Sequence, residues 1–115
     1  MDAPKRIDAA TQKAARAFIR RLGDQYDLAQ ALLYGSRARN THRPDSDADL
    51  ALVLRGPHGR KFDAVRVMSG IAFDVMLETG ILIQPAPIWE DEWQHPEHFG
   101  NTEFIENIQR EGIRL

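Results

Sequence analysis

The stretch LLYGSRARNTHRPDSDADLALVL, residues 32–54, places a Gly-Ser pair after one apolar run and three aspartates at the entrance of the next. The runs on either side, residues 28–34 and 48–54, have the length and composition of β-strands. The polar segment that begins after Gly35 predicts a loop, or at most one helical turn. Three carboxylates therefore lie close together at the start of a strand, although aspartate is a poor strand former.

Asp47 and Asp49 are separated by one residue at the start of the second predicted strand, and Asp45 precedes them. Alternate side chains of a strand share a face, so Asp47 and Asp49 project together with Cα atoms ~6.5–7 Å apart. Two carboxylates at that spacing can share one divalent cation or hold two. Exposed aspartates are also common at strand starts, so this pattern alone leaves a metal site and an ordinary polar strand end as alternatives.

The Gly-Ser pair, Gly35 and Ser36, ends about ten residues before the aspartates. Glycine allows a ligand to approach the backbone, and the N–H groups of a turn that opens into a helical segment can bind phosphate oxygens. Ser36 adds a hydroxyl, and Arg37 and Arg39 add positive charge. A lone Gly-Ser is typical of an ordinary turn. Placed between a strand and an Asp-x-Asp, it predicts a triphosphate on one side and magnesium on the other.

Two longer helices are predicted around these strands. The first covers residues 8–22 and is closed by Gly23, and the second covers residues 61–79 and ends at Gly80. The residues expected to give the first helix its apolar period are Ile7, Ala10, Ala14, Phe18 and Leu22. Those expected to do so in the second are Phe62, Val65, Met68, Ala72, Val75 and Thr79.

A third strand, residues 81–88, contains Pro85 and Pro87, which cannot donate to a ladder and so belong at a sheet edge or strand end. Residues 89–93 predict a short helix and residues 101–110 a last one. Trp89 and Trp93 are expected to cover the edge of the core. The order α-β-β-α-β-α predicts an α/β or α+β fold with a small mixed sheet, formed by residues 1–115 as a single domain.

The composition limits the partners and the compartment. The chain has no cysteine, so any metal must be held by oxygen or imidazole, which favours a hard cation. No apolar stretch approaches the ~20 residues of a membrane-spanning helix, and the N-terminus lacks the apolar centre of a signal peptide. We therefore expect a cytoplasmic protein without a membrane partner.

Positive charge is concentrated in the first predicted helix, although the net charge of −2 argues against indiscriminate nucleic-acid binding. A solvated helix face explains this cluster, and a docking surface for an acidic partner or an RNA is the alternative. Direct nucleic-acid binding therefore stays open. The residues of this basic cluster are Lys5, Arg6, Lys13, Arg16, Arg20 and Arg21.

The segment GSRARNTHRPDSDADLALV resembles the signature of the minimal nucleotidyltransferases (MNT domains) of the DNA polymerase β-like superfamily. The order of predicted elements agrees with the minimal fold of that superfamily. The resemblance implies that Gly35 and Ser36 hold the β- and γ-phosphates of ATP, with Arg37 beside them. It also implies that Asp47 and Asp49 are the catalytic residues and bind Mg²⁺, for transfer of a nucleotidyl group with pyrophosphate leaving.

The sequence departs from the resembled pattern at two positions. Asn40 stands where many members have a second glycine, a mild change because asparagine tolerates a left-handed turn. The third acidic residue, usual on the next strand, is absent, and Gln84 lies on that strand instead. Its amide cannot accept a proton at neutral pH. Asp74 is the nearest substitute, but its periodicity predicts an exposed position on the helix of residues 61–79.

Two interpretations follow from these features. The first is an ATP- and Mg²⁺-dependent nucleotidyltransferase similar to the MNT antitoxins encoded beside HEPN-domain ribonuclease toxins, which implies AMP transfer to a hydroxyl of the partner toxin. A chain of this length has little left to enclose an acceptor, so the acceptor is expected to be a macromolecule. The second is a binding module that neutralises its partner by stoichiometric complex formation, with a vestigial nucleotide site. The intact Gly-Ser and Asp-x-Asp favour the first, and the missing third acid favours the second.

Overall fold

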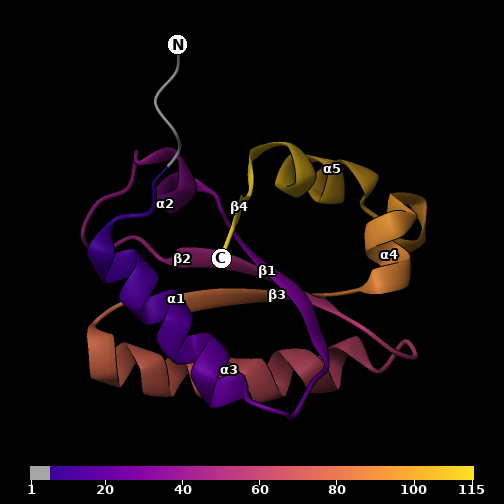
Figure 1. The fold of residues 1–115 in the computed structure, drawn as a ribbon, viewed down its shortest axis with the longest axis horizontal. Coiled ribbons are helices and arrows are strands. Elements are labelled where there is room, and N and C mark those ends of the chain that lie inside the picture. The colour runs from indigo at the N-terminus through magenta and orange to yellow at the C-terminus, as the bar shows by residue number, and fades with distance from the viewer. Residues whose placement is uncertain (1–5) are drawn as a thin grey trace.

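A computed structural model describes residues 6–115 and contains a four-stranded mixed sheet in the order β3-β2-β1-β4 (Figure 1). Strand β1 runs antiparallel to β2, and β2 runs parallel to β3. The short β4 pairs antiparallel with the other edge of β1. The bounds of the strands are Leu28–Tyr34 for β1, Ala48–Leu54 for β2, Ile83–Trp89 for β3 and Ile113–Arg114 for β4.

Helices cover both faces of the sheet, because alternate residues of β1 and β2 are apolar on both sides. Helices α1 and α3 pack on one face, where Leu50 and Leu52 meet Phe18 and Met68. The C-terminal helices lie over the other face, where Val53 joins their buried side chains. The helices are α1 (Ala9–Leu22), α2 (Ser36–Arg39), α3 (Lys61–Thr79), α4 (Glu90–Gln94), the 3₁₀-helix η1 (Pro96–Phe99) and α5 (Thr102–Glu111).

The small mixed sheet flanked by helices confirms the predicted fold class. The predicted bounds of β1, β2 and α3 are the observed ones. Pro85 and Pro87 lie on β3, at an edge of the sheet, as their missing N–H groups require. Strand β4 was not predicted, since two residues are too few to show an alternating pattern.

The apolar face predicted for the helix of residues 61–79 is wrong at its N-terminal end. Ala64, Met68 and Val75 are buried, whereas Phe62 is 77% exposed and Val65 is 38% exposed. Phe62 lies two residues, and so about 200° of helix rotation, from Ala64, which places it on the opposite side. The large apolar side chains of α3 are therefore divided between the core and the surface.

Two smaller predictions about the core also have clear outcomes. In α1, Ala10 was expected on the apolar face but is exposed, and the neighbouring Thr11 is buried instead. Trp89 is buried, and Trp93 packs against the apolar cluster that Val53 forms with the C-terminal helices, as predicted.

Across residues 6–115, no helix has the length and apolar character needed to cross a membrane.

Candidate functional site

The Gly-Ser turn and the two aspartates, predicted from separate motifs, are neighbours in the structure. Tyr34, the last residue of β1, is the cross-strand partner of Asp49 on β2. The chain leaves β1 at Gly35, where φ is 76°. A Cβ atom at Gly35 would overlap Oδ2 of Asp49 and lie 3.2 Å from its Cγ. The Asp49 carboxylate therefore lies directly against a backbone that only glycine can provide.

The turn itself is short and fixed at both ends. The N–H groups of Ala38 and Arg39 each donate to the Gly35 carbonyl at 3.1 Å. The N–H groups of Ser36 and Arg37, at the first two positions of α2, have no acceptor within that helix. At the other end Asn40 adopts the left-handed conformation, with φ 57° and ψ 34°. Asn40 therefore supports a left-handed turn, as expected for asparagine at this position.

Gln84 lies beside the aspartate pair, at the start of β3. It is in register with Asp49, and its Nε2 donates to Oδ2 of Asp47 at 3.0 Å. Asp47, Asp49 and Gln84 thus come together at one end of the sheet. The position expected for a third carboxylate is occupied by an amide.

Asp74 is not part of this group. It is exposed on α3, as predicted, and α3 packs on the face of the sheet opposite the one that Tyr34 and Asp49 share. Within residues 6–115, no cluster of three or more carboxylate or imidazole side chains is placed to hold a metal. The site offers two carboxylates and one amide oxygen.

The electrostatics of the site favour a bound cation. Burial raises the pKa of Asp49, the neighbouring Asp47 carboxylate raises it further, and Arg39 opposes the shift. Burial, followed by the charge of Asp49, raises the pKa of Tyr34 to about 12. Tyr34 therefore stays a neutral phenol at physiological pH. A cation between the carboxylates would relieve the repulsion between them.

The positively charged side chain of Arg39 lies near the site and forms an ion pair with the last helix. Its Nη1 lies 3.2 Å from Oε1 of Glu111, at the end of α5. About half of its side chain is exposed, so it remains accessible to solvent and to an anionic ligand. The sequence indicated the charge but not this link to α5.

The structure corrects the role of the Arg37 side chain. Only 2% of Arg37 is exposed, and its guanidinium donates to the carbonyls of Ser46 at 3.0 Å and Pro44 at 3.1 Å. It also donates to Oγ1 of Thr11 at 2.8 Å. The side chain points into the protein and fixes the loop that leads to Asp47. Its burial had no signal in the sequence, because an arginine beside a Gly-Ser turn also suits phosphate binding.

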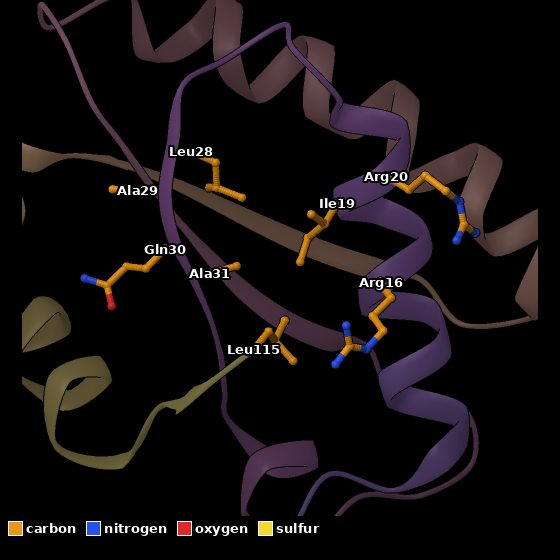
Figure 2. Close-up of a pocket in the computed structure, with 8 residues that line it drawn as sticks. All are labelled: Arg16, Ile19, Arg20, Leu28, Ala29, Gln30, Ala31 and Leu115. Carbon is orange, nitrogen blue, oxygen red and sulfur yellow. The ribbon is translucent and has the colours of Figure 1, made fainter.

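A pocket of about 470 Å³ lies elsewhere, between α1 and the beginning of β1 (Figure 2). Arg16 and Arg20 of the predicted basic cluster line it, together with Ile19, Leu28 and residues 29–31 and 115. Arg21 instead pairs with Glu78 at 3.0 Å. Lys5 lies outside the described residues. This pocket is at the end of β1 opposite the aspartate pair, so it is separate from the candidate site.

We expect Gly35→Ala to disrupt the site, because its Cβ would displace the Asp49 carboxylate. Gly56→Ala is the matched control, since Gly56 also has a positive φ, of 91°, but a Cβ there meets nothing within 4 Å. Both changes carry the backbone strain of a positive φ, about 1–3 kcal/mol each. Only Gly35→Ala should also weaken nucleotide binding by more than about tenfold in calorimetry. Equal effects of the two changes on binding would mean that the turn is merely structural.

Ser36→Ala should have a smaller effect. The change removes one hydroxyl from a half-buried turn and leaves the fold intact, so we expect a loss of roughly 1 kcal/mol of nucleotide binding. The same calorimetric titration measures it, and unchanged thermal unfolding would show that the loss comes from the site. A loss as large as that of Gly35→Ala would contradict this assignment.

Asp49→Asn is expected to stabilise the metal-free protein. Because the folded-state pKa of Asp49 lies above its ordinary value of 3.8, the folded state binds more protons, and stability falls as pH rises through that window. The advantage of Asp49→Asn should be present at neutral pH, at no more than about 1 kcal/mol for this half-exposed group, and vanish below pH 3.8. Urea unfolding over a pH series measures it, with Asp45→Asn as the control. An Asp49→Asn variant less stable than wild type at pH 7 would refute the argument.

Comparison with known proteins adds two findings. Residues 15–112 match a family model described as a nucleotidyltransferase domain. The fold is similar to that of a crystal structure from Sulfolobus solfataricus that carries a provisional assignment as a nucleotidyltransferase. The two chains are 20% identical, with a TM-score of 0.57 over 83% of this chain and 84% of that chain, a likeness that bears on the fold. No curated protein matches the sequence significantly.

Proposed function

The chain belongs to the nucleotidyltransferase domain family, and from this premise we propose that it transfers AMP from ATP, with Mg²⁺, to a hydroxyl of a partner macromolecule. The observation that carries the proposal is the contact between Gly35 and Asp49. It brings a turn suited to phosphate oxygens against a carboxylate suited to a divalent cation. A nucleotide's phosphates and its counter-ion need these two groups within a few ångströms of each other.

The donor set fits Mg²⁺ bound together with a nucleotide. Mg²⁺ commonly takes one or two carboxylates from the protein and completes its shell with substrate phosphates and water. Asp47 and Asp49 supply the carboxylates, and burial together with the neighbouring Asp47 raises the pKa of Asp49. When bound, the ion would neutralise phosphate charge and favour ionisation of the attacking hydroxyl.

The chain's own residues have separate roles in this proposal. The N–H groups of Ser36 and Arg37, with the Ser36 hydroxyl, orient the phosphates, and Arg39 adds positive charge at their open side. The Arg37 side chain holds the loop that positions Asp47. Neither Gln84, an amide, nor Tyr34, with its pKa of about 12, serves as a base at neutral pH. We therefore propose that the proton of the attacking hydroxyl is transferred to the substrate or to a group of the partner.

The partner that the resemblance implies is a HEPN-domain toxin, for which this chain would act as the antitoxin. A macromolecular acceptor is supported by the exposure of Asp47 and Arg39 at this end of the sheet, where a large partner could reach them. The second candidate function is a stoichiometric binding module with a weak nucleotide site. The amide of Gln84, bound to Asp47 in place of a third carboxylate, favours it.

Calorimetry with ATP in the presence and absence of Mg²⁺ tests the nucleotide site. We expect Mg²⁺ to strengthen ATP binding by tenfold or more, since the two carboxylates hold only part of the ion's shell. Asp47→Asn/Asp49→Asn should abolish this dependence, and parallel titrations with other nucleoside triphosphates would give the preference. ATP binding indifferent to Mg²⁺ would rule out the proposed site.

Gln84→Glu tests whether a third carboxylate limits the activity. Because Gln84 contacts Asp47, the new carboxylate would join the pair, and we expect tighter Mg²⁺ binding and a transfer rate raised several-fold. Mg²⁺ should also raise the Tm of Gln84→Glu more than that of the wild type, because it relieves more repulsion. Gln84→Met is the control for loss of the hydrogen bond. A Gln84→Glu variant no better than the wild type in either respect would show that the missing acid is not limiting.

A further inference from the structure

Helix α3 exposes a stripe of large apolar side chains along the side that faces away from the sheet. Phe62 is 77% exposed, Phe73 is 53% exposed and Leu77 is 70% exposed. Phe73 follows Phe62 by three turns and Leu77 follows Phe73 by one, so the three side chains share one side of the helix. Figure 1 shows α3 at the lower border of the molecule, on the side of the sheet away from α5.

The exposed area is large for a chain of this size. At about 200 Å² for an aromatic side chain, the two phenylalanines alone expose on the order of 250 Å². Leu77, together with the 38% exposed Val65, extends the same stripe. Contiguous apolar patches of several hundred Å² on soluble proteins commonly mark interaction surfaces.

Gly70, at the middle of the stripe, gives independent evidence of a partner. It lies in the interior of α3, where glycine costs about 1 kcal/mol relative to alanine. Its φ is not positive, and a Cβ there would meet nothing within 4 Å, so nothing in the described chain requires glycine. The neighbouring Ser69 is also small and exposed. Small residues between large apolar ones allow a second helix to approach closely at that point.

The stripe is symmetric about this small pair. Phe62 precedes Ser69 by as many residues as Leu77 follows Gly70, and Arg66 and Phe73 are related in the same way. A two-fold axis through Ser69 and Gly70 would therefore place Phe62 of one copy opposite Leu77 of another. Self-complementarity of this kind is what an isologous dimer interface needs.

The same two-fold axis would bring opposite charges of the two copies close together. In an antiparallel pair of α3 helices, Arg66 of one copy would lie over Phe73 and beside Asp74 of the other. Within residues 6–115, neither Arg66 nor Asp74 makes an ion pair or a side-chain hydrogen bond. A second copy would supply both with a partner, through a salt bridge and a cation–π contact.

We propose that the exposed face of α3 binds a second copy of this chain, as an antiparallel helix pair centred on Ser69 and Gly70. The area of a single helix face places the complex at the small end of specific interfaces, below about 1,200 Å² in total. It is therefore a reversible dimer, formed on the face of the sheet away from the aspartate pair. The proposal does not depend on the proposed nucleotidyltransfer.

Sedimentation analysis over a wide range of protein concentration is the first test. The mass should rise from the 13.1 kDa of one chain towards twice that value. Phe73→Glu/Leu77→Glu should remain monomeric, and Asn107→Glu on the exposed side of α5 is the control for an added negative charge. A wild type that stays monomeric throughout, or a double variant that dimerises as well as the wild type, would overturn the proposal.

A charge reversal tests the antiparallel geometry. Arg66→Glu should weaken association several-fold, and Arg66→Glu/Asp74→Arg should restore it, because Arg66 of one copy lies beside Asp74 of the other in this arrangement. Gly70→Gln should raise the Tm of the monomer, through better helix propensity, while weakening the dimer. No rescue by the double reversal, or an unweakened Gly70→Gln dimer, would contradict this arrangement.

Cross-linking tests the axis directly, because the natural chain contains no cysteine. Ser69→Cys should form a disulfide-linked dimer on mild oxidation, since this residue lies at the proposed axis. Asn107→Cys, equally exposed but on α5, is the matched control. Linkage of Ser69→Cys no faster than that of Asn107→Cys would overturn the proposal.

Discussion

Asp47→Asn/Asp49→Asn is expected to reduce nucleotidyl transfer by roughly 10³-fold or more while the protein stays folded. In the proposed mechanism the two carboxylates hold the Mg²⁺ whose charge compensates the reacting phosphates, and removal of such preorganised groups costs orders of magnitude in rate. Incubation with the partner protein, ATP and Mg²⁺ should add the mass of one adenylyl group to the partner, as measured by mass spectrometry. Asp45→Asn, an exposed aspartate of the same segment, should transfer at close to the wild-type rate.

The same experiment separates the two candidate functions. An enzyme should modify many partner molecules per chain, and the double variant should bind the partner without modifying it. If the wild type leaves the partner's mass unchanged and the double variant still neutralises it at one-to-one stoichiometry, the catalytic proposal is wrong. The binding-module function would then stand.

Arg37→Met is expected to lower the free energy of unfolding by about 3 kcal/mol, because it removes a buried cation and leaves its acceptors unpaired. The carbonyls of Pro44 and Ser46 and the hydroxyl of Thr11 would each lose a donor. For a chain of this size the Tm should fall by about 10 °C. Methionine keeps most of the length of the side chain, so the loss reports hydrogen bonds and charge rather than volume.

Arg39→Met is the control for this prediction, since Arg39 belongs to the same short helix but is half exposed. Its ion pair with Glu111 is worth no more than about 1 kcal/mol. Arg37→Met should also weaken ATP binding, because the loop before Asp47 loses its anchor. Equal thermal stability of the two variants would refute the structural role assigned to Arg37.

Local sequence patterns were sufficient for most of the fold. The length and apolar content of residues 28–34 and 48–54 placed β1 and β2, and Gly80 marked the end of α3. The missing N–H groups of Pro85 and Pro87 placed β3 at an edge. These predictions succeed because propensity, capping and hydrogen-bonding capacity act within a few residues of the chain.

What the sequence by itself determined about this protein is the set of groups at the candidate site: a Gly-Ser turn, Asp47 and Asp49 on one strand, and no third acid on the next. Tertiary structure alone decided their relations. It placed Gly35 against Asp49, bound Gln84 to Asp47, and turned Arg37 inward instead of towards a ligand. It also left Phe62 outside the core. The physical reason is that strand register, burial and hydrogen-bond partners depend on residues far apart in the chain, which no local pattern encodes.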